Sequence, residues 1–501
     1  MSSATTDEWY DRALAQRPEG RAFIDGAYVE TASGRTYDTI TPLSGLRLTA
    51  VADGDGEDID RAVRAARRAH DRGQWADAHP RDRKRVLHRF TDLLLEHQDE
   101  LALLITTDMG KPISDARREI ESSARELRFF AESVDKVYGD VAPTAPYALG
   151  MVTREPAGVV GAITPWNFPV MMPVYKLGPA LAAGNAVVLK PAEQSALAAV
   201  RLAALASEAG LPDGVLNVVP GGPAAGEHLA RHLDVDVLTF TGSTEVGKRL
   251  LVYSGESNMK PVWLECGGKS PNIVLADAPD LDVAARAAAE GIFHGAGEVC
   301  NAGSRLLVED AVFDEVVGKV VEESAHWQPR DALDPTSRMG PLVDQRQLDR
   351  VMSFVEEGRA SGIRLETGGR RTLEETGGYY LEPTIFSDVD NASRLAQEEI
   401  FGPVLSVVRL SSAQEAVELG NATVYGLAAA VWTSDVTRAF TIARQLKAGT
   451  VYVNCYDKGD NSLPFGGYKQ SGIGADRSLH AMDKYTNLKT LWVDLSQHPR
   501  A

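Results

Sequence analysis

Hydrophobic and polar positions are distributed along this chain in two different ways. In residues 57–70 and 80–97, apolar residues recur at helical spacing among Arg and Asp, which predicts two amphipathic helices with one solvated face. From residue 158 onward, short runs rich in Val, Ile and Leu alternate with Ala- and Leu-rich stretches of helical length. Strands separated by such helices are typical of an α/β fold with a doubly wound parallel sheet, which binds ligands at the carboxyl ends of its strands.

The expected elements form two successive α/β segments after an N-terminal region, residues 1–137, that is expected to be an acidic arm followed by helices. In the first segment, strands are expected at 158–164, 186–190, 214–219 and 235–240, with helices at 174–184 and 195–210. In the second, which begins near Ser270, strands are expected at 271–276, 304–310, 383–386, 404–410, 428–433 and 450–454. Two further apolar segments, 147–154 and 490–494, either form an arm that pairs with a partner subunit or pack on their own domain.

Composition narrows the class of protein. A chain of 501 residues is too long for one ordinary domain, and 44% hydrophobic with 24% charged residues is ordinary for a soluble globular enzyme. A net charge of -18 argues against nucleic acid as the main partner, which demands basic patches. The 3 cysteines, Cys266, Cys300 and Cys455, have no CxxC spacing, which excludes a disulfide framework and a cysteine-rich zinc site and suits a reducing cytosol.

One long uncharged run, Pro156 to Tyr175, has the length of a membrane span. It contains four prolines, which would break a spanning helix. The N-terminus lacks the basic start and apolar core of a secretory signal. We therefore expect a cytoplasmic protein without membrane or nucleic-acid partners.

Cys300 is the first candidate for chemistry. It follows an Ala-rich apolar run and two glycines, and it lies among the small residues of GEVCNAGSR (297–305). A ligand can approach a thiol in such surroundings, and exposed backbone N–H groups would favour its thiolate. The alternative is a small buried hydrophobe, as free cysteines often are.

Two stretches suggest a dinucleotide site. The strand ending at Phe240 runs into TGSTEVG (241–247), a small-residue turn that opens a helix and offers N–H groups to a pyrophosphate. In LKPAEQS (189–195), Lys190 and Glu193 are suited to hold the two hydroxyls of a ribose. Glu193 would repel a 2′-phosphate, so NAD is favoured over NADP. An ordinary turn and a surface ion pair are the alternatives.

Two polar residues at predicted strand ends complete the set. Asn167 lies between prolines in PWNFP (165–169), and a rigid amide is a suitable donor for a developing oxyanion. Glu265 ends an apolar strand before two glycines, where burial would raise its proton affinity and suit a general base. A turn amide and a salt-bridged carboxylate are the alternatives.

Seven motifs together are more specific than any one of them: PWNFP, LKPAE, FTGSTEVG, LECGGKSPN, GEVCNAGSR, EEIFGPV and PFGGYKQSG. In order and rough spacing, from about Ala22 to Val493, they resemble the aldehyde dehydrogenase superfamily. The resemblance implies a Rossmann-like NAD-binding domain (1–137 and 157–267), an α/β catalytic domain (268–467) and a small β oligomerisation arm (138–156 and 478–501), assembled as a homodimer or homotetramer.

The resemblance also implies roles for individual residues, and no metal. Cys300 matches the nucleophile, Glu265 the general base, Asn167 with the Cys300 N–H the oxyanion site, and Lys176 with Asp476 a proton relay. Cofactor contacts are implied for Trp166, Lys190, Glu193, Gly222, Gly226, Phe240, Gly242, Ser243, Val246, Gln347, Glu399 and Phe401. The thiolate would attack the aldehyde, hydride would leave to the nicotinamide, and Glu265 would activate water to hydrolyse the thioester.

The chain departs from the family pattern in two places. Gly295, Ala296 and Glu298 stand where Asn, Gln and Gln are common, and Glu298 is expected to point away from Cys300. The usual Arg-Glu pair after PFGGYKQSG is replaced by Ala475-Asp476, which puts the relay in question.

Within the superfamily the chain is most similar to γ-glutamyl-γ-aminobutyraldehyde dehydrogenases of putrescine catabolism, through DEWYDRALA, FFAESVDKVYGDVAP and YDKGDNSLPFGGYKQSG among other stretches. The loop 457–463, with Asp457, Lys458 and Asp460, is expected to border the aldehyde entrance. Betaine aldehyde, aminobutyraldehyde or a broad aliphatic range are alternative substrates. Alternative classes are a cysteine hydrolase using His294, a non-catalytic crystallin-like protein, and a coenzyme-A-acylating dehydrogenase, for which Glu265 is not needed.

Overall fold

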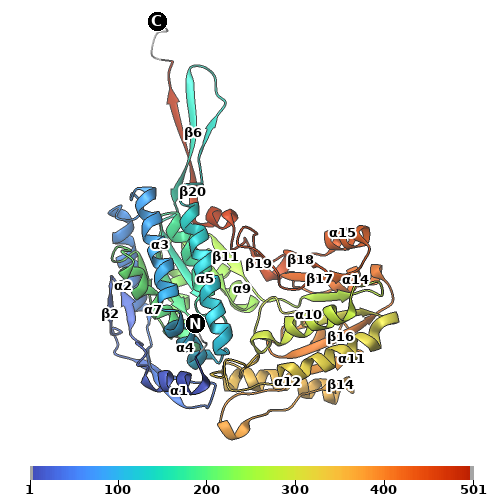
Figure 1. The fold of residues 1–501 in the computed structure, drawn as a ribbon. Helices are drawn as coiled ribbons and strands as arrows, with labels where there is room; N and C mark the ends of the chain where they lie inside the picture. Colours follow the sequence, from blue (N-terminus) through green and yellow to red (C-terminus); the bar gives the residue numbers. More distant parts are fainter. Residues whose placement is uncertain (1–3, 497–501) are drawn as a thin grey trace.

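The computed structural model describes residues 4–496, which form two α/β lobes and a projecting β arm (Figure 1). One lobe is built on an eight-stranded sheet, the other on a seven-stranded sheet, and the arm on three strands. The expected α/β architecture is confirmed.

The first sheet has the strand order β19-β11-β10-β7-β8-β9-β1-β2. Its five central strands, β11 to β9, are parallel. They are β7 (Val159–Thr164), β8 (Ala186–Pro191), β9 (Leu216–Val218), β10 (Val237–Thr241) and β11 (Val262–Glu265), and β19 (Gly472–Ile473) extends the edge. The chain runs from β7 outward through β8 and β9 and then returns to β10 on the other side of β7. The carboxyl ends of β7 and β10 therefore form the switch point at which such sheets bind ligands.

Helices cover both faces of this sheet and bury its continuous apolar strands. The expected helices at 57–70, 80–97, 174–184 and 195–210 are all present. The helices of this lobe are α2 (Gly56–Asp71), α3 (Pro80–Glu96), α4 (Gln98–Met109), α5 (Ile113–Ser133), α6 (Met171–Ala182), α7 (Ala196–Glu208), α8 (Pro223–Arg231) and α9 (Thr244–Gly255).

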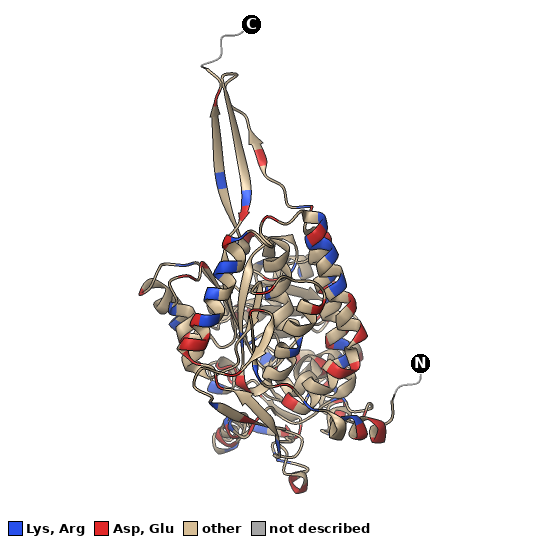
Figure 2. Ribbon diagram, turned by 90° about the vertical axis from the view of Figure 1, so that its left-hand side faces the viewer, with Lys and Arg blue, Asp and Glu red and all other residues tan. Residues whose placement is uncertain are grey.

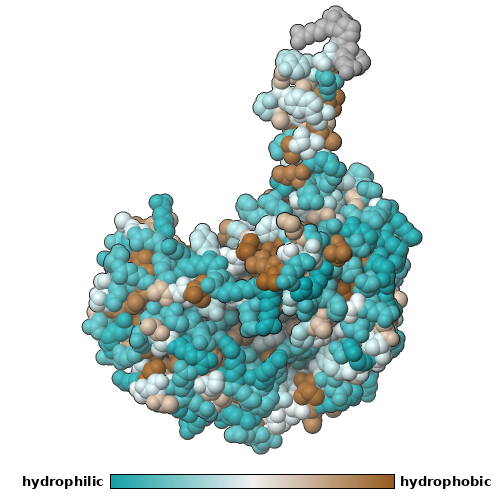
Figure 3. Space-filling model, turned by 180° about the vertical axis from the view of Figure 1, so that it is seen from behind, coloured by the Kyte–Doolittle hydropathy of each residue, from teal (hydrophilic) through white to brown (hydrophobic). Residues whose placement is uncertain are grey.

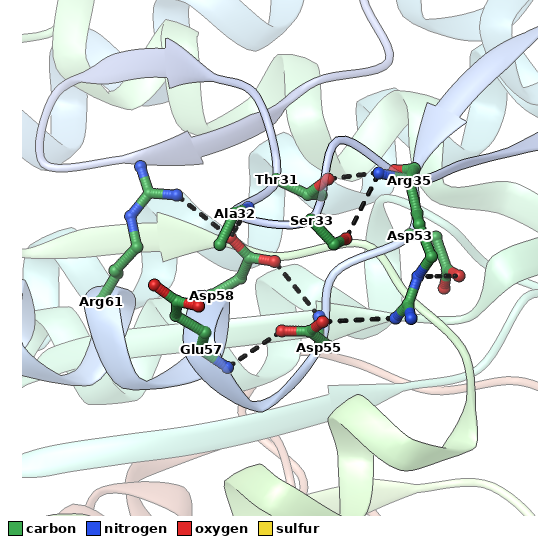
Figure 4. A network of polar contacts seen from close by, with 9 residues as sticks. All are labelled: Thr31, Ala32, Ser33, Arg35, Asp53, Asp55, Glu57, Asp58 and Arg61. Carbon is green, nitrogen blue, oxygen red and sulfur yellow. Dashed lines mark hydrogen bonds and ion pairs between the residues drawn. The ribbon is translucent and has the colours of Figure 1, made fainter.

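The expectation for the N-terminal region was wrong in one respect. It holds α1 (Thr6–Ala15) and later helices, but also β1 (Ala22–Ile24), β2 (Ala27–Val29), β3 (Thr36–Ile40) and β4 (Arg47–Ala52). β1 and β2 have only three residues each, and β3 and β4 mix polar with apolar residues, so these strands show no clear period of two. Figure 4 shows how they are tied to α2: the buried Asp58 accepts hydrogen bonds from Ala32 N and Arg61, while Asp55 caps the helix.

The second sheet has the order β14-β15-β16-β13-β12-β17-β18, and all six expected strands belong to it. They are β12 (Pro271–Val274), β13 (Arg305–Glu309), β15 (Thr384–Ser387), β16 (Val404–Leu410), β17 (Ala428–Trp432) and β18 (Thr450–Val453), with β14 (Arg364–Thr367) antiparallel at the edge. Its helices are α10 (Leu281–Phe293), α11 (Phe313–Ser324), α12 (Gln345–Ala360), α13 (Arg394–Gln397), α14 (Ala413–Asn421) and α15 (Val436–Gln445).

The arm consists of β20 (Thr486–Asp494) paired antiparallel with β6 (Ala148–Pro156), with β5 (Asp140–Ala142) on the other side of β6. It extends away from the lobes, carries few charged residues (Figure 2), and has apolar surface along it and at its base (Figure 3). Leu488 and Trp492 are 65% and 62% exposed. The two apolar segments therefore pair with each other rather than with their own lobes. Residues 497–501 of the predicted arm lie outside the described residues.

No helix within residues 4–496 is both long enough and apolar enough to cross a membrane. The run from Pro156 to Tyr175 forms the end of β6, β7, the PWNFP turn and the start of α6 instead.

Candidate active site

Cys300 lies in a wall shared by two cavities. Helix α10 ends at Phe293, and Gly295 and Ala296 then take positive φ values of 58° and 55°, which turn the chain sharply. Gly297, also at positive φ, packs on the backbone of Gly402 so closely that any side chain there would collide. This turn delivers the partly exposed Cys300 between a cavity of about 540 Å³ and one of about 610 Å³.

The 540 Å³ cavity lies at the carboxyl ends of β7, β10 and β11. It brings Asn167 and Glu265 to the same space as Cys300, although the three residues come from different elements. Of the predicted cofactor residues, Trp166, Gly242, Ser243, Gln347, Glu399 and Phe401 line it.

Glu265 ends β11 and is 4% exposed, and neither of its carboxylate oxygens has a hydrogen-bond partner. Burial raises the pKa of Glu265 well above its ordinary value, and the nearby Asp476 raises it further, while Lys176 and Lys484 oppose the rise. The raised proton affinity of this carboxylate suits a general base.

Behind Glu265, Asp476 bridges two buried lysines. Lys176 Nζ lies 2.5 Å from Asp476 Oδ2, and Lys484 donates to Oδ1. Burial would raise the pKa of Asp476, but the two ammonium groups together lower it below its ordinary value. The replacement of the usual Arg-Glu pair by Ala475-Asp476 therefore leaves a carboxylate paired with Lys176.

Asn167 is buried, and its Nδ2 donates to the carbonyl oxygen of Glu298 at 2.7 Å. This bond fixes the amide in the turn before Cys300. Its second Nδ2 hydrogen remains for an oxygen atom in the cavity, because a primary amide carries two donors. The Glu298 carboxylate accepts from Val343 N at 3.1 Å, and Glu298 lines neither cavity that contains Cys300, as expected.

A backbone N–H does favour the Cys300 thiolate, as predicted, but other groups outweigh its effect. Burial raises the pKa of the Cys300 thiol, and Glu265, Glu399 and Asp457 raise it further, whereas only the Asn301 N–H lowers it. The resting thiol is protonated and needs a base to become a nucleophile.

The predicted phosphate and ribose residues lie along one edge of the first sheet. Ser243 caps α9 by accepting from Val246 N at 3.3 Å, and Gly242 precedes it. Lys190 Nζ lies 3.6 Å from Glu193 Oε2 at the end of β8. Lys190, Glu193, Gly222, Gly226, Phe240 and Val246 do not line the 540 Å³ cavity. All six belong to β8, to β10 or to the segments that follow β8, β9 and β10. They lie along the edge of the first sheet that continues from this cavity.

On the opposite wall of that cavity, the side chains of Glu399 and Gln347 pack closely against backbone groups. Glu399 accepts from Gly268 N at 3.0 Å and lies so near Gly267 that a Cβ there would be 2.0 Å from Oε2. Gln347 donates to the Phe401 carbonyl at 2.6 Å, and the Phe401 ring meets Trp166 edge to face at 5.3 Å. A buried carboxylate, an edge-to-face pair of aromatic rings and a helix N-terminus fit the ribose, nicotinamide and pyrophosphate of a dinucleotide.

The 610 Å³ cavity contains residues that sequence reasoning missed. The loop 457–461 borders it as expected, but helix α5 forms its other wall, about 170 positions before Cys300 in the chain. The α5 residues are Ser122, Arg125, Glu126, Arg128, Phe129 and Glu132. Only the likeness of FFAESVDKVYGDVAP to one subgroup pointed to this helix.

His294, the base of the alternative hydrolase, does not share a cavity with Cys300. It lies 3.3 Å from Asp115, and burial lowers its pKa. No His, Cys, Asp and Glu cluster of metal-binding size occurs within residues 4–496.

Comparison with known proteins identifies the protein family over nearly the whole chain. The model of the aldehyde dehydrogenase family matches residues 28–491. The NADP/NAD-dependent aldehyde dehydrogenase PuuC of Escherichia coli K12 is 52% identical over 97% of this chain and 98% of its own.

Two solved structures are similarly close. The γ-glutamyl-γ-aminobutyraldehyde dehydrogenase of Burkholderia cenocepacia is 54% identical, with a TM-score of 0.97 over 98% of this chain and 100% of its own. The indole-3-acetaldehyde dehydrogenase AldA of P. syringae, a mutant in complex with NAD+ and IAA, is 55% identical with the same TM-score and coverage.

Proposed function

Because this chain belongs to the aldehyde dehydrogenase family, and is an NAD(P)-dependent enzyme, we propose that it oxidises γ-glutamyl-γ-aminobutyraldehyde or a related polar aldehyde through a covalent bond to Cys300. One observation carries the proposal. Cys300 lies between a cavity suited to a dinucleotide and a second cavity with a charged wall. Such a site holds an aldehyde on one side of the sulfur and its oxidant on the other.

The first step forms the covalent intermediate. Glu265 takes the proton of the Cys300 thiol, and the sulfur attacks the carbonyl carbon of the aldehyde to give a thiohemiacetal. The attack moves the π electrons of the carbonyl to its oxygen, so the thiohemiacetal forms as an oxyanion, which the Asn167 side-chain amide and the Cys300 backbone N–H stabilise. When bound, NAD accepts the hydride that leaves this carbon, and a thioester remains on Cys300.

The second step releases the acid. Glu265 removes a proton from water, whose oxygen attacks the thioester carbon, and the carbon–sulfur bond breaks to regenerate Cys300. The buried Asp476 with Lys176 and Lys484 lies behind Glu265 and would accept or return its proton. Lys176 is therefore proposed as the first member of a proton relay.

Residues at the carboxyl edge of the first sheet would hold the cofactor. Ser243, Gly242 and Val246 at the start of α9 suit the pyrophosphate, with Trp166 beside them, and Gly222, Gly226 and Phe240 suit the adenine side. Lys190 and Glu193 suit one ribose, and Glu399, with Gln347 and Phe401, suits the other and the nicotinamide. A carboxylate at 193 favours NAD over NADP.

The substrate proposal rests on the charged wall of the 610 Å³ cavity. Eight charged side chains line it, four of each sign: Arg125, Glu126, Arg128, Glu132, Asp457, Lys458, Asp460 and Arg477. Such a wall favours an aldehyde with a polar, zwitterionic tail over an indole or a plain aliphatic chain, because charged groups must be desolvated to accept apolar ligands.

A panel of aldehydes tests this function. The proposal expects the highest kcat/KM for γ-glutamyl-γ-aminobutyraldehyde among it, aminobutyraldehyde, betaine aldehyde, indole-3-acetaldehyde and butyraldehyde, with NAD above NADP. Cys300→Ala should abolish turnover but keep NAD binding. A preference for indole-3-acetaldehyde or butyraldehyde would contradict the substrate, and turnover by Cys300→Ala would contradict the mechanism.

We also propose that the arm joins subunits, and that the protein is a cytoplasmic homodimer or homotetramer. Its exposed Leu488 and Trp492 would be covered in an assembly, since contiguous apolar surface of this kind usually marks an interface. The three cysteines are free, as in a reducing compartment. Sedimentation of the wild type and of Leu488→Glu with Trp492→Glu would measure the state, and an unchanged assembly would contradict the proposal.

A further inference from the structure

Arg477 is an unusual residue in the wall of the 610 Å³ cavity. Both Arg477 and the next residue, Ser478, have positive φ values, 62° and 54°. Residues other than glycine rarely adopt this conformation, and it persists only where the surroundings fix it. Before Arg477, the buried ion pairs of Asp476 with Lys176 and Lys484 fix the chain. After it, Ser478 N fixes the chain by donating to the Asn461 carbonyl at 3.0 Å.

The Arg477 guanidinium has few partners for its five N–H donors. Nη2 donates to Asn461 Oδ1 at 3.4 Å, and Nε lies 3.6 Å from Glu126 Oε2 but makes no hydrogen bond. Of the Arg477 nitrogens, only Nε is buried without a partner, and the side chain is 17% exposed where it lines the cavity. Buried donors without acceptors are rare in folded proteins and point to a missing ligand.

The carboxylate beside Arg477 does not fully neutralise it. Oε1 of Glu126 is buried and has no hydrogen-bond partner. Burial raises the pKa of Glu126 to about 7, against the opposing effect of Arg477. Glu126 is therefore only partly ionised near neutral pH, and a positive charge remains available at Arg477.

The other cations of the cavity are placed differently. Arg128 is paired with Asp92 at 3.1 Å, and Arg125 donates to Ser122 on the exposed face of α5. Lys458 is exposed on the loop 457–461, where Asp460 is bonded to Ser462. Among these arginines, Arg477 alone is mostly buried, and a single hydrogen bond, from Nη2 to Asn461, is made by its guanidinium.

We propose that Arg477 binds a carboxylate at the far end of the aldehyde substrate. The planar guanidinium fork matches a carboxylate with two parallel hydrogen bonds, so an α-carboxylate such as that of a γ-glutamyl group fits it. This inference rests on the proposed function, because it names the group that the same cavity recognises. Arg477 is then the residue that selects carboxylated aldehydes over neutral ones.

Two substrates isolate the carboxylate. γ-Glutamyl-γ-aminobutyraldehyde and N-acetyl-γ-aminobutyraldehyde share the aldehyde arm and the amide, but only the first has the amino-acid head. Arg477→Gln should lower kcat/KM for the first by roughly 10- to 100-fold, mainly through KM, and change the second by less than about three-fold. Arg477→Lys should keep part of the preference. Arg89→Gln, which removes a surface arginine paired with Glu96 at 2.6 Å outside the cavity, should change neither substrate by more than about three-fold.

The outcomes separate this inference from the proposed function. If the wild type does not prefer the γ-glutamyl aldehyde, the proposed substrate and this inference both fail. If the wild type prefers it and Arg477→Gln keeps that preference, or loses both substrates equally, only the role of Arg477 fails. Should Arg477→Gln not fold, as thermal unfolding would reveal, Arg477→Lys decides: wild-type kcat/KM for both substrates, or an equal loss on both, overturns the inference.

Discussion

The side-chain amide of Asn301 donates to Asp457 Oδ1 at 2.8 Å, and the Tyr456 hydroxyl donates to the Asn301 carbonyl at 2.6 Å. Asp457, the first residue of the loop that borders the 610 Å³ cavity, and Tyr456 before it therefore both hold the residue next to Cys300 in place. An aldehyde tail bound against this loop, as proposed, would act on the same contacts that position the sulfur.

Asp457→Ala should reduce kcat about 10-fold, because an ångström-scale displacement of Cys300 is costly to a step that needs close alignment. Asp457→Asn keeps an acceptor for Asn301 and should retain most of the rate. Asp460→Ala is the matched control, since Asp460 lies in the same loop and its carboxylate accepts hydrogen bonds from Ser462 and not from Asn301. Steady-state kinetics with a small neutral aldehyde measures the effect, and equal rates for Asp457→Ala and Asp460→Ala would refute it.

Asp457→Asn should also change the titration of Cys300. The Asp457 carboxylate is one of the groups that raise the pKa of the thiol, because a negative charge disfavours the thiolate. Its removal lowers that pKa, so the pH profile of iodoacetamide alkylation moves to lower pH. The cofactor-free enzyme is used for the measurement. A profile that stays in place or moves to higher pH would show that Asp457 does not influence the sulfur.

Glu265→Gln should lower the activity of the enzyme and raise its stability at alkaline pH. It removes the base, so kcat should fall by at least about 100-fold. The folded protein binds the Glu265 proton more tightly than the unfolded chain does, because its pKa is raised. That stabilising effect is fully present below the unfolded pKa and is lost as pH rises through the folded value. The variant should therefore be more stable than wild type at alkaline pH, by about 1 kcal/mol, and the difference should vanish toward pH 4.

Thermal unfolding of both proteins from pH 4 to pH 9 measures this difference. The control is Glu245→Gln, on the exposed start of α9, where the carboxylate is 76% exposed and pays no burial cost. A Glu265→Gln variant that is less stable than wild type at every pH would mean that the carboxylate is not destabilising where it is.

The parallel strands could be predicted from the sequence because each is a short apolar run that ends at a turn, as AVVLK and VDVLTF illustrate. The sequence did not reveal β1 to β4, because β1 and β2 have only three residues each and β3 and β4 mix polar with apolar residues. The cluster of Cys300, Glu265 and Asn167 was expected only through resemblance to a family, since no spacing links residues on three separate elements. The α5 wall and Arg477 stayed hidden, because packing of distant segments, and not local pattern, brings them to Cys300.

Glu193 is expected to set the preference between the two cofactors. Its carboxylate lies 3.6 Å from Lys190, in a position to meet the adenosine ribose, and a 2′-phosphate there would face like charge. Glu193→Gln should raise kcat/KM for NADP about 10-fold and lower that for NAD modestly, because the amide still bonds a hydroxyl. Glu256→Gln, at the opposite end of α9 from the proposed pyrophosphate site and 57% exposed, is the control. If the NAD to NADP ratio does not change, Glu193 does not contact the ribose.

The buried Lys176–Asp476–Lys484 cluster should be far more important to the fold than a surface pair on the same segment. Asp476→Asn leaves two ammonium groups buried without a counter-charge, which costs about 3–5 kcal/mol. Asp483→Asn removes the carboxylate that pairs with Arg154 at 2.7 Å and is 58% exposed, and it should cost less than about 1 kcal/mol. Urea unfolding gives both values.

Asp476 also raises the pKa of Glu265 while the two lysines lower it, so Asp476→Asn should move the acidic limb of kcat to lower pH. Equal destabilisation by the two variants, or an acidic limb that moves to higher pH, would mean that this cluster neither supports the core nor controls the base.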